Sequence, residues 1–80
     1  MRIRYFAGAA EAAGVTEEII DADFEVTVAE LVEQLGAERE RLAKVLAVST
    51  VLIDGQPAHQ RTEYVGRNAQ VDVLPPFAGG

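Results

Sequence analysis

The stretch VTVAELVEQLG (residues 26–36) decides the fold expected of this 80-residue chain, because both its start and its buried face are specified. Thr27 and Glu30 have the spacing of a capping box, in which each side chain satisfies a free backbone N–H of the first helical turn. The residues that share the apolar face are Val28, Leu31, Val32 and Leu35. Gly36 is well placed to end the helix. The stretch therefore predicts an amphipathic helix with one buried face.

Two segments at opposite ends of the chain have the pattern of half-buried strands. RIRYF (residues 2–6) and QVDVL (residues 70–74) both alternate apolar and polar positions. The positions expected to face the core are Ile3, Tyr5, Val71 and Val73. This assignment leaves Phe6 and Leu74 on the polar side of the sheet, where they could form a docking patch.

The remaining segments complete an α+β domain. Residues 7–14 are Ala-rich between glycines and fit a loop or a short helix, and residues 17–25 fit a second strand. Residues 37–47 predict a second helical stretch, and STVLIDG (residues 49–55) predicts a strand that enters an Asp-Gly turn. These elements predict a single domain over residues 1–80, with a helix across one face of a small mixed sheet.

The composition excludes several classes of function. The net charge is −6, which argues against nucleic acid or an anionic membrane surface as a partner, since both require clustered positive charge. The chain contains no cysteine, so a disulfide framework, a thiolate metal site and a catalytic thiol are all excluded. No signal peptide or membrane span is recognisable, and we expect a cytoplasmic protein.

The usual catalytic residues are almost absent. His59 is the only histidine and lies in a polar segment, and Ser49 is the only serine and lacks a nucleophile-elbow motif. The carboxylates of Glu17, Glu18 and their neighbours lack the spacing of a calcium loop and are expected to form a solvated acidic edge. We therefore expect neither a metal site nor an autonomous active site.

The ending LPPFAGG (residues 74–80) is the most unusual part of the sequence. Pro75 and Pro76 fix φ and favour an extended path away from the last strand. Gly79 and Gly80 present the thinnest possible backbone, which could enter a tunnel that a Cβ would block. We therefore interpret residues 75–80 as an extended functional tail, rather than as a frayed terminus.

Four motifs spread over the whole chain together resemble a known family. RYFA at the start, TVAEL in the capped helix, the Asp-Gly turn and the ending DVLPPFAGG are similar to the small, sulfur-carrying subunit of molybdopterin synthase, in the MoaD/ThiS family of ubiquitin-like sulfur carriers. The terminal PPFAGG is the most specific of these motifs. The resemblance implies a β-grasp fold. The segment VGRNAQ departs from the family, which commonly has an Asp-Gly-Asp type of turn there.

The resemblance also implies a mechanism in which Gly80 carries the sulfur. An ATP-dependent, ubiquitin-activating-like enzyme would adenylate Gly80, and a sulfur donor would convert the adenylate to a thiocarboxylate. The tail would then enter the large subunit of molybdopterin synthase and donate sulfur to the cyclic pterin precursor. Gly79 would give clearance in both partners, and no cofactor would be bound. The residues expected to contact the partner are Phe6, Leu74, Pro75, Pro76, Phe77 and Ala78, with Pro57 and Ala58 near the same surface.

Three alternatives remain open. A sister carrier would deliver sulfur to thiamin or cysteine biosynthesis through the same thiocarboxylate. A ubiquitin-like modifier would instead join Gly80 to a target lysine through an amide bond. A plain β-grasp interaction module would make no use of the tail.

Overall fold

The computed structural model describes residues 1–21 and 25–76 of the chain. Within these residues there are three helices: α1 (Gly8–Ala13), α2 (Val28–Gly36) and α3 (Glu40–Val48). The strands are β1 (Arg2–Tyr5), β2 (Glu17–Ile19), β3 (Val26–Thr27), β4 (Thr50–Ile53), β5 (Gln56–Pro57), β6 (Tyr64–Val65) and β7 (Gln70–Leu74). None of the helices in this described part is long and apolar enough to cross a membrane.

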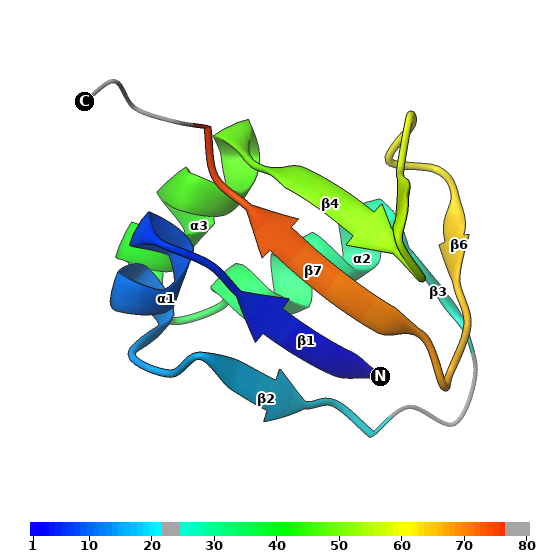
Figure 1. Ribbon diagram of the computed structural model, residues 1–80, viewed down its shortest axis with the longest axis horizontal. Helices are drawn as coiled ribbons and strands as arrows, with labels where there is room; N and C mark the ends of the chain where they lie inside the picture. Colours follow the sequence, from blue (N-terminus) through cyan, green and yellow to red (C-terminus); the bar gives the residue numbers. More distant parts are fainter. Residues whose placement is uncertain (22–24, 77–80) are drawn as a thin grey trace.

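The main sheet is mixed and has the strand order β2-β1-β7-β4-β5. Its centre is formed by β1 and β7, which run parallel and side by side although they come from opposite ends of the chain (Figure 1). The other neighbouring strands pair antiparallel, and β3 and β6 form a separate two-stranded ribbon. The chain therefore leaves the last strand from the middle of the sheet.

The helices cover one face of this sheet, and the core lies between the two layers. The alternation predicted for the central strands is confirmed, because the side chains expected to face the core are almost completely buried: Ile3, Tyr5, Val71 and Val73. They pack in one cluster with buried residues of the helices: Ala9, Val28, Leu31, Leu35, Leu42 and Leu46. The prediction of an α+β domain is confirmed.

The capping box at the start of α2 is present as predicted. The Thr27 hydroxyl accepts a hydrogen bond from the backbone N–H of Glu30 at 3.1 Å. The Glu30 carboxylate accepts one from the backbone N–H of Thr27 at 2.9 Å. Because both bonds lie within four residues, the sequence alone specifies this helix start.

Gly36 is the last residue of α2, as predicted, but no left-handed glycine cap ends the helix. The following residue, Ala37, has a φ of −61°, and the left-handed conformation falls on Glu38, with a φ of 61°. A Cβ built on Gly36 would lie 2.9 Å from the Cβ of Ala43 in α3. Gly36 is therefore needed for the close approach of two helices, and the turn at Glu38 delays the start of α3 to Glu40 rather than Ala37.

The remaining local predictions were met in part. Residues 7–14 form the short helix α1, which Gly14 ends with a φ of 80°. The turn at Asp54 and Gly55 has positive φ at both residues, as expected for a two-residue hairpin. The strand expected over residues 17–25 is shorter, since β2 ends at Ile19. Residues 22–24 lie outside the described residues.

Candidate partner-binding face and C-terminal tail

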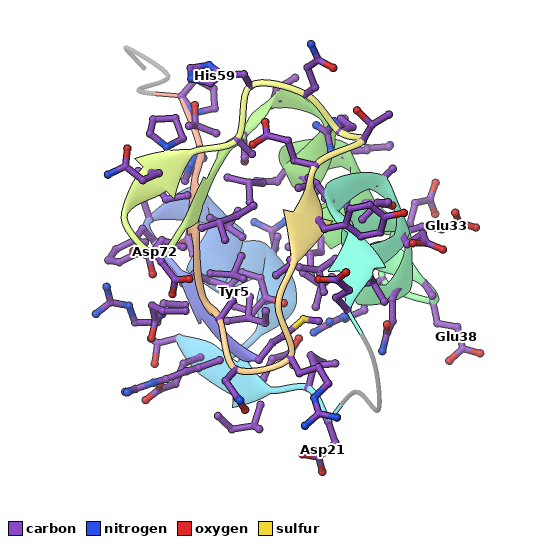
Figure 2. All side chains as sticks on the ribbon, turned by 90° about the vertical axis from the view of Figure 1, so that its right-hand side faces the viewer. Tyr5, Asp21, Glu33, Glu38, His59 and Asp72 are labelled. Carbon is purple, nitrogen blue, oxygen red and sulfur yellow. The ribbon has the colours of Figure 1, made fainter. Side chains whose placement is uncertain are left out.

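The outer face of the main sheet is the side that points away from the helices. Figure 2 shows this layering: Tyr5 lies in the interior, Asp72 lies toward the outer side of the sheet, and Glu33 lies on the helical side. The strand register places ten side chains on the outer face: Ile19, Glu17, Arg2, Arg4, Gln70, Asp72, Leu74, Thr50, Leu52 and Pro57. Phe6, directly after β1, continues the alternation onto this face. The face therefore combines apolar residues with a charged centre.

Phe6 lies at the base of the tail. Its side chain is 39% exposed, and its backbone N–H donates a hydrogen bond to the carbonyl of Val73 at 3.2 Å. Leu74, the last residue of β7, is half-buried, as is Pro75, whereas Pro76 is exposed. The expectation that Phe6 and Leu74 face away from the core agrees with this geometry.

The chain leaves the sheet beside the start of β4. Leu74 pairs with Thr50 across the sheet, and Figure 1 shows the end of β7 next to the junction of α3 and β4. Pro57 pairs with Leu52 on the outer face, so it belongs to the same surface, while Ala58 packs against the core. Four predicted tail residues lie outside the described residues: Phe77, Ala78, Gly79 and Gly80.

An ion pair occupies the centre of the outer face. The Nε and Nη2 atoms of Arg4 donate to the two carboxylate oxygens of Asp72 at 2.9 and 3.1 Å. The side-chain amide of Gln70 donates to the same carboxylate at 3.0 Å. Asp72 is only 8% exposed, and its hydrogen bonds with Arg4 hold the pKa of its carboxyl below the ordinary value, against the opposing effect of burial.

Arg4 also connects this ion pair to Phe6. The guanidinium carbon of Arg4 lies 5.5 Å from the centre of the Phe6 ring, which is within the range of a cation–π contact. Sequence reasoning placed Arg4 and Asp72 on polar faces but did not join them. Their pairing depends on the parallel register of β1 and β7, which no local pattern specifies.

The acidic residues of β2 are not simply solvated, contrary to the prediction. Glu17 pairs with Arg2 at 2.6 Å on the outer face. Glu18 points inward, where it accepts hydrogen bonds from the Tyr5 hydroxyl at 2.6 Å and from Arg39 at 2.8 Å. The hydrogen bond from Arg39 lowers the pKa of Glu18, and burial raises the pKa of Tyr5. Glu18 therefore links β2 to β1 through Tyr5 and to the start of α3 through Arg39.

Other polar residues with catalytic potential have structural roles or are isolated. The Ser49 hydroxyl donates to the carbonyl of Val45 at 2.7 Å, at the end of α3. His59 lies exposed in the segment after β5 (Figure 2). Over residues 1–21 and 25–76, no group of three or more His, Cys, Asp or Glu side chains could hold a metal ion.

Comparison with known proteins gives matches over nearly the whole chain. Residues 3–80 match the ThiS family. SAMP1 from Haloferax volcanii superposes with a TM-score of 0.82 at 26% identity, covering 100% of this chain and 98% of that chain. No curated protein sequence gives a significant match.

Two more distant solved structures support the fold. A putative molybdopterin converting factor subunit 1 from Pyrococcus furiosus has a TM-score of 0.81 at 24% identity, covering 95% of each chain. A complex of subunits 1 and 2 of the molybdopterin-converting factor from Helicobacter pylori gives a TM-score of 0.69 at 22% identity, covering 99% of this chain and 96% of that chain. The β-grasp, ubiquitin-like fold is confirmed by these similarities.

Proposed function

The chain belongs to the ThiS family and is thus a ubiquitin-like sulfur carrier or modifier, and we propose that it is the sulfur-carrying small subunit of a molybdopterin synthase. The observation that carries this proposal is the place where the chain leaves the sheet. The central strand β7, which PPFAGG follows in the sequence, is hydrogen-bonded at Val73 to the backbone of Phe6, whose side chain is exposed. One partner could therefore hold the sheet face while the tail reaches into its interior.

The length and the residue types of the tail suit such a delivery. The six residues from Pro75 to Gly80 can span roughly 20 Å when extended. The prolines restrict the first part of this path, and Gly79 and Gly80 carry no side chain that could obstruct a narrow channel. Contacts of the partner with Phe6 and Leu74 would offset the entropy lost when the tail becomes ordered.

The proposed chemistry takes place at the carboxyl group of Gly80. Its carboxylate attacks the α-phosphate of ATP on an activating enzyme, which forms an acyl-adenylate and releases pyrophosphate. Sulfide from a sulfur donor then attacks the acyl carbon, so that a C–S bond replaces the C–O bond to AMP. AMP leaves, and loss of the proton on sulfur gives the thiocarboxylate. In the large synthase subunit this sulfur attacks a carbon of the pterin precursor and displaces an oxygen from it. Water then hydrolyses the resulting thioester, so that the sulfur stays on the pterin and Gly80 regains its carboxylate. Two loaded carriers supply one dithiolene.

A modifier function is the second candidate. It is favoured by the similarity to SAMP1, because a further solved structure of the Haloferax volcanii protein is described as small archaeal modifier protein 1, at 25% identity. In that case the activated Gly80 would form an amide with a lysine of a target protein. The same sheet face and tail would serve either function. The two functions therefore differ in the acceptor, which is the pterin precursor for a sulfur carrier and a lysine for a modifier.

Reconstitution tests the proposal. The chain is combined with the activating enzyme, a sulfur source and the large synthase subunit of the same organism, and molybdopterin is measured. We expect product with the full chain and none after deletion of Gly79 and Gly80, with the same thermal unfolding for both proteins. If the chain becomes loaded with sulfur but yields no molybdopterin, and if it complements a thiamin or cysteine pathway, then it is a sister carrier. A ladder of conjugates on a denaturing gel would identify a modifier.

A further inference from the structure

We propose that Arg4 is a specificity-determining residue of the outer face, and that it binds a carboxylate on the partner next to the pocket that receives Phe6. This inference rests on the proposed function, because it concerns the same partner. It adds a polar requirement to a surface whose apolar residues are Ile19, Phe6, Leu74 and Pro57.

Arg4 is held in place before any partner arrives. Two of its donors bind the carboxylate of Asp72, which also accepts a hydrogen bond from the side-chain amide of Gln70 at 3.0 Å. Its guanidinium also lies 5.5 Å from the centre of the Phe6 ring. A guanidinium already held by two neighbours loses little further entropy when it binds, so a contact made by Arg4 is more favourable than one made by a free arginine.

Arg4 also has unused binding capacity. A guanidinium has five N–H donors, and Asp72 accepts from Nε and Nη2 only. Nη1 has no hydrogen-bond partner in the described part of the chain, and the Arg4 side chain is 45% exposed, whereas that of Asp72 is 12% exposed. The ion pair therefore offers the partner its cationic member and hides the anionic one.

The positive charge of Arg4 contrasts with the rest of the molecule. The chain has a net charge of −6, so a cationic group at the centre of one face marks where an acidic group can approach. Arg2 lies on the same face but is paired with Glu17, which is itself about half exposed. Glu17 also lies opposite Arg4 in the strand register, but its carboxylate binds Arg2, whereas the carboxylate that binds Arg4, that of Asp72, is covered. Arg4 is therefore the better candidate. A planar guanidinium also favours carboxylate geometry over other polar groups.

Binding to the large synthase subunit tests this role, with dissociation constants measured by calorimetry at low and high salt. The variants are Arg4→Gln, Asp72→Asn and the double variant, with Arg41→Gln on α3 as the control for the change in net charge. We expect Arg4→Gln to weaken binding by about tenfold to hundredfold and to reduce its salt dependence. Arg41→Gln should bind like the wild type.

The double variant separates recognition from structural support. If Arg4 only neutralises Asp72, then the double variant will bind the large subunit as tightly as the wild type does, and the inference is overturned. If Arg4 contacts the partner, the double variant will stay as weak as Arg4→Gln. If Arg4→Gln binds the large subunit as tightly as the wild type does, this inference is overturned, but the proposed function is not. A wild-type chain that does not bind the large subunit would overturn both this inference and the proposed function.

Discussion

The backbone N–H of Phe6 donates a hydrogen bond to the carbonyl of Val73, and this bond joins the end of β1 to the last part of β7 before the tail. The two segments come from opposite ends of the sequence and lie together only because β1 and β7 pair in parallel. The base of the tail is therefore anchored to the centre of the sheet. A partner that binds the outer face near Phe6 also receives the tail at a fixed starting point.

Substitution of Phe6 should separate partner binding from folding. Phe6→Arg places a charge in the expected apolar contact, and we expect binding to the large subunit to weaken by about tenfold or more. Because Phe6 is already 39% exposed, the free energy of unfolding should change by less than about 1 kcal/mol. Calorimetric titration and urea unfolding measure the two effects.

Tyr64→Arg is the matched control for this substitution. Tyr64 is an aromatic residue that is 64% exposed, and it lies on β6, far from the end of β7 (Figure 1). The Tyr64→Arg substitution should leave binding to the large subunit unchanged. Equal losses of binding in both variants, or a large loss of stability in Phe6→Arg, would show that Phe6 is not a docking residue.

Gly36→Ala should destabilise the protein although alanine favours helix formation. The new Cβ would lie 2.9 Å from the Cβ and 3.1 Å from the Cα of Ala43, so α2 and α3 must move apart. We expect a loss of about 1–3 kcal/mol in urea unfolding. Gly8→Ala in α1 is the control, because its Cβ would meet nothing within 4 Å, and it should be neutral or slightly stabilising. The same effect at both positions would contradict the close helix contact.

Glu18 should contribute stability that depends on pH. Its folded pKa is lowered, mainly by Arg39, so the unfolded state binds its proton more readily. The stabilisation is therefore complete above the ordinary pKa of about 4 and is lost as pH falls through the lower folded value. We expect Glu18→Gln to cost about 1–2 kcal/mol at neutral pH and much less near about pH 3.

Urea unfolding of both proteins at the two pH values measures this difference. Glu18→Gln keeps an oxygen that can accept the Tyr5 hydroxyl, so the comparison isolates the charge. A difference in stability that is independent of pH would mean that the ion pair with Arg39 does not stabilise the fold.

The Thr27 hydroxyl in the capping box of α2 should contribute about as much to the free energy of unfolding as one hydrogen bond does. Thr27→Ala removes the acceptor of the Glu30 N–H, and we expect it to lower the free energy of unfolding by about 1 kcal/mol. Thr27→Ser retains the hydroxyl and should stay close to the wild type. A loss in Thr27→Ser as large as in Thr27→Ala would assign the effect to the methyl group of Thr27 instead.

The sequence predicted features that depend on local patterns. The cap at Thr27 and the turn at Asp54 and Gly55 are each fixed by a few neighbouring residues, and both are present. The alternation in the central strands placed Ile3 and Tyr5 in the core. The same alternation left Phe6 and Leu74 on the opposite side, and it therefore indicated the candidate face.

Features that depend on distant contacts were missed. The short strand β6 exists because Val65 pairs with Val26, which lies far away in the sequence. The role of Gly36 depends on the approach of Ala43, and the burial of Asp72 depends on its register with Arg4. The interpretation of residues 75–80 as a functional tail rests on their proline and glycine content and on the family resemblance, and it stays a prediction.

Intact mass spectrometry of the chain, expressed with its own activating enzyme and sulfur source, tests the central claim most directly. We predict a mass increase equal to the replacement of one oxygen by sulfur, located at Gly80 by fragmentation. The increase should disappear when the activating enzyme is omitted. An unmodified Gly80 in the presence of an active enzyme and sulfur source would contradict the account of this chain as a sulfur carrier.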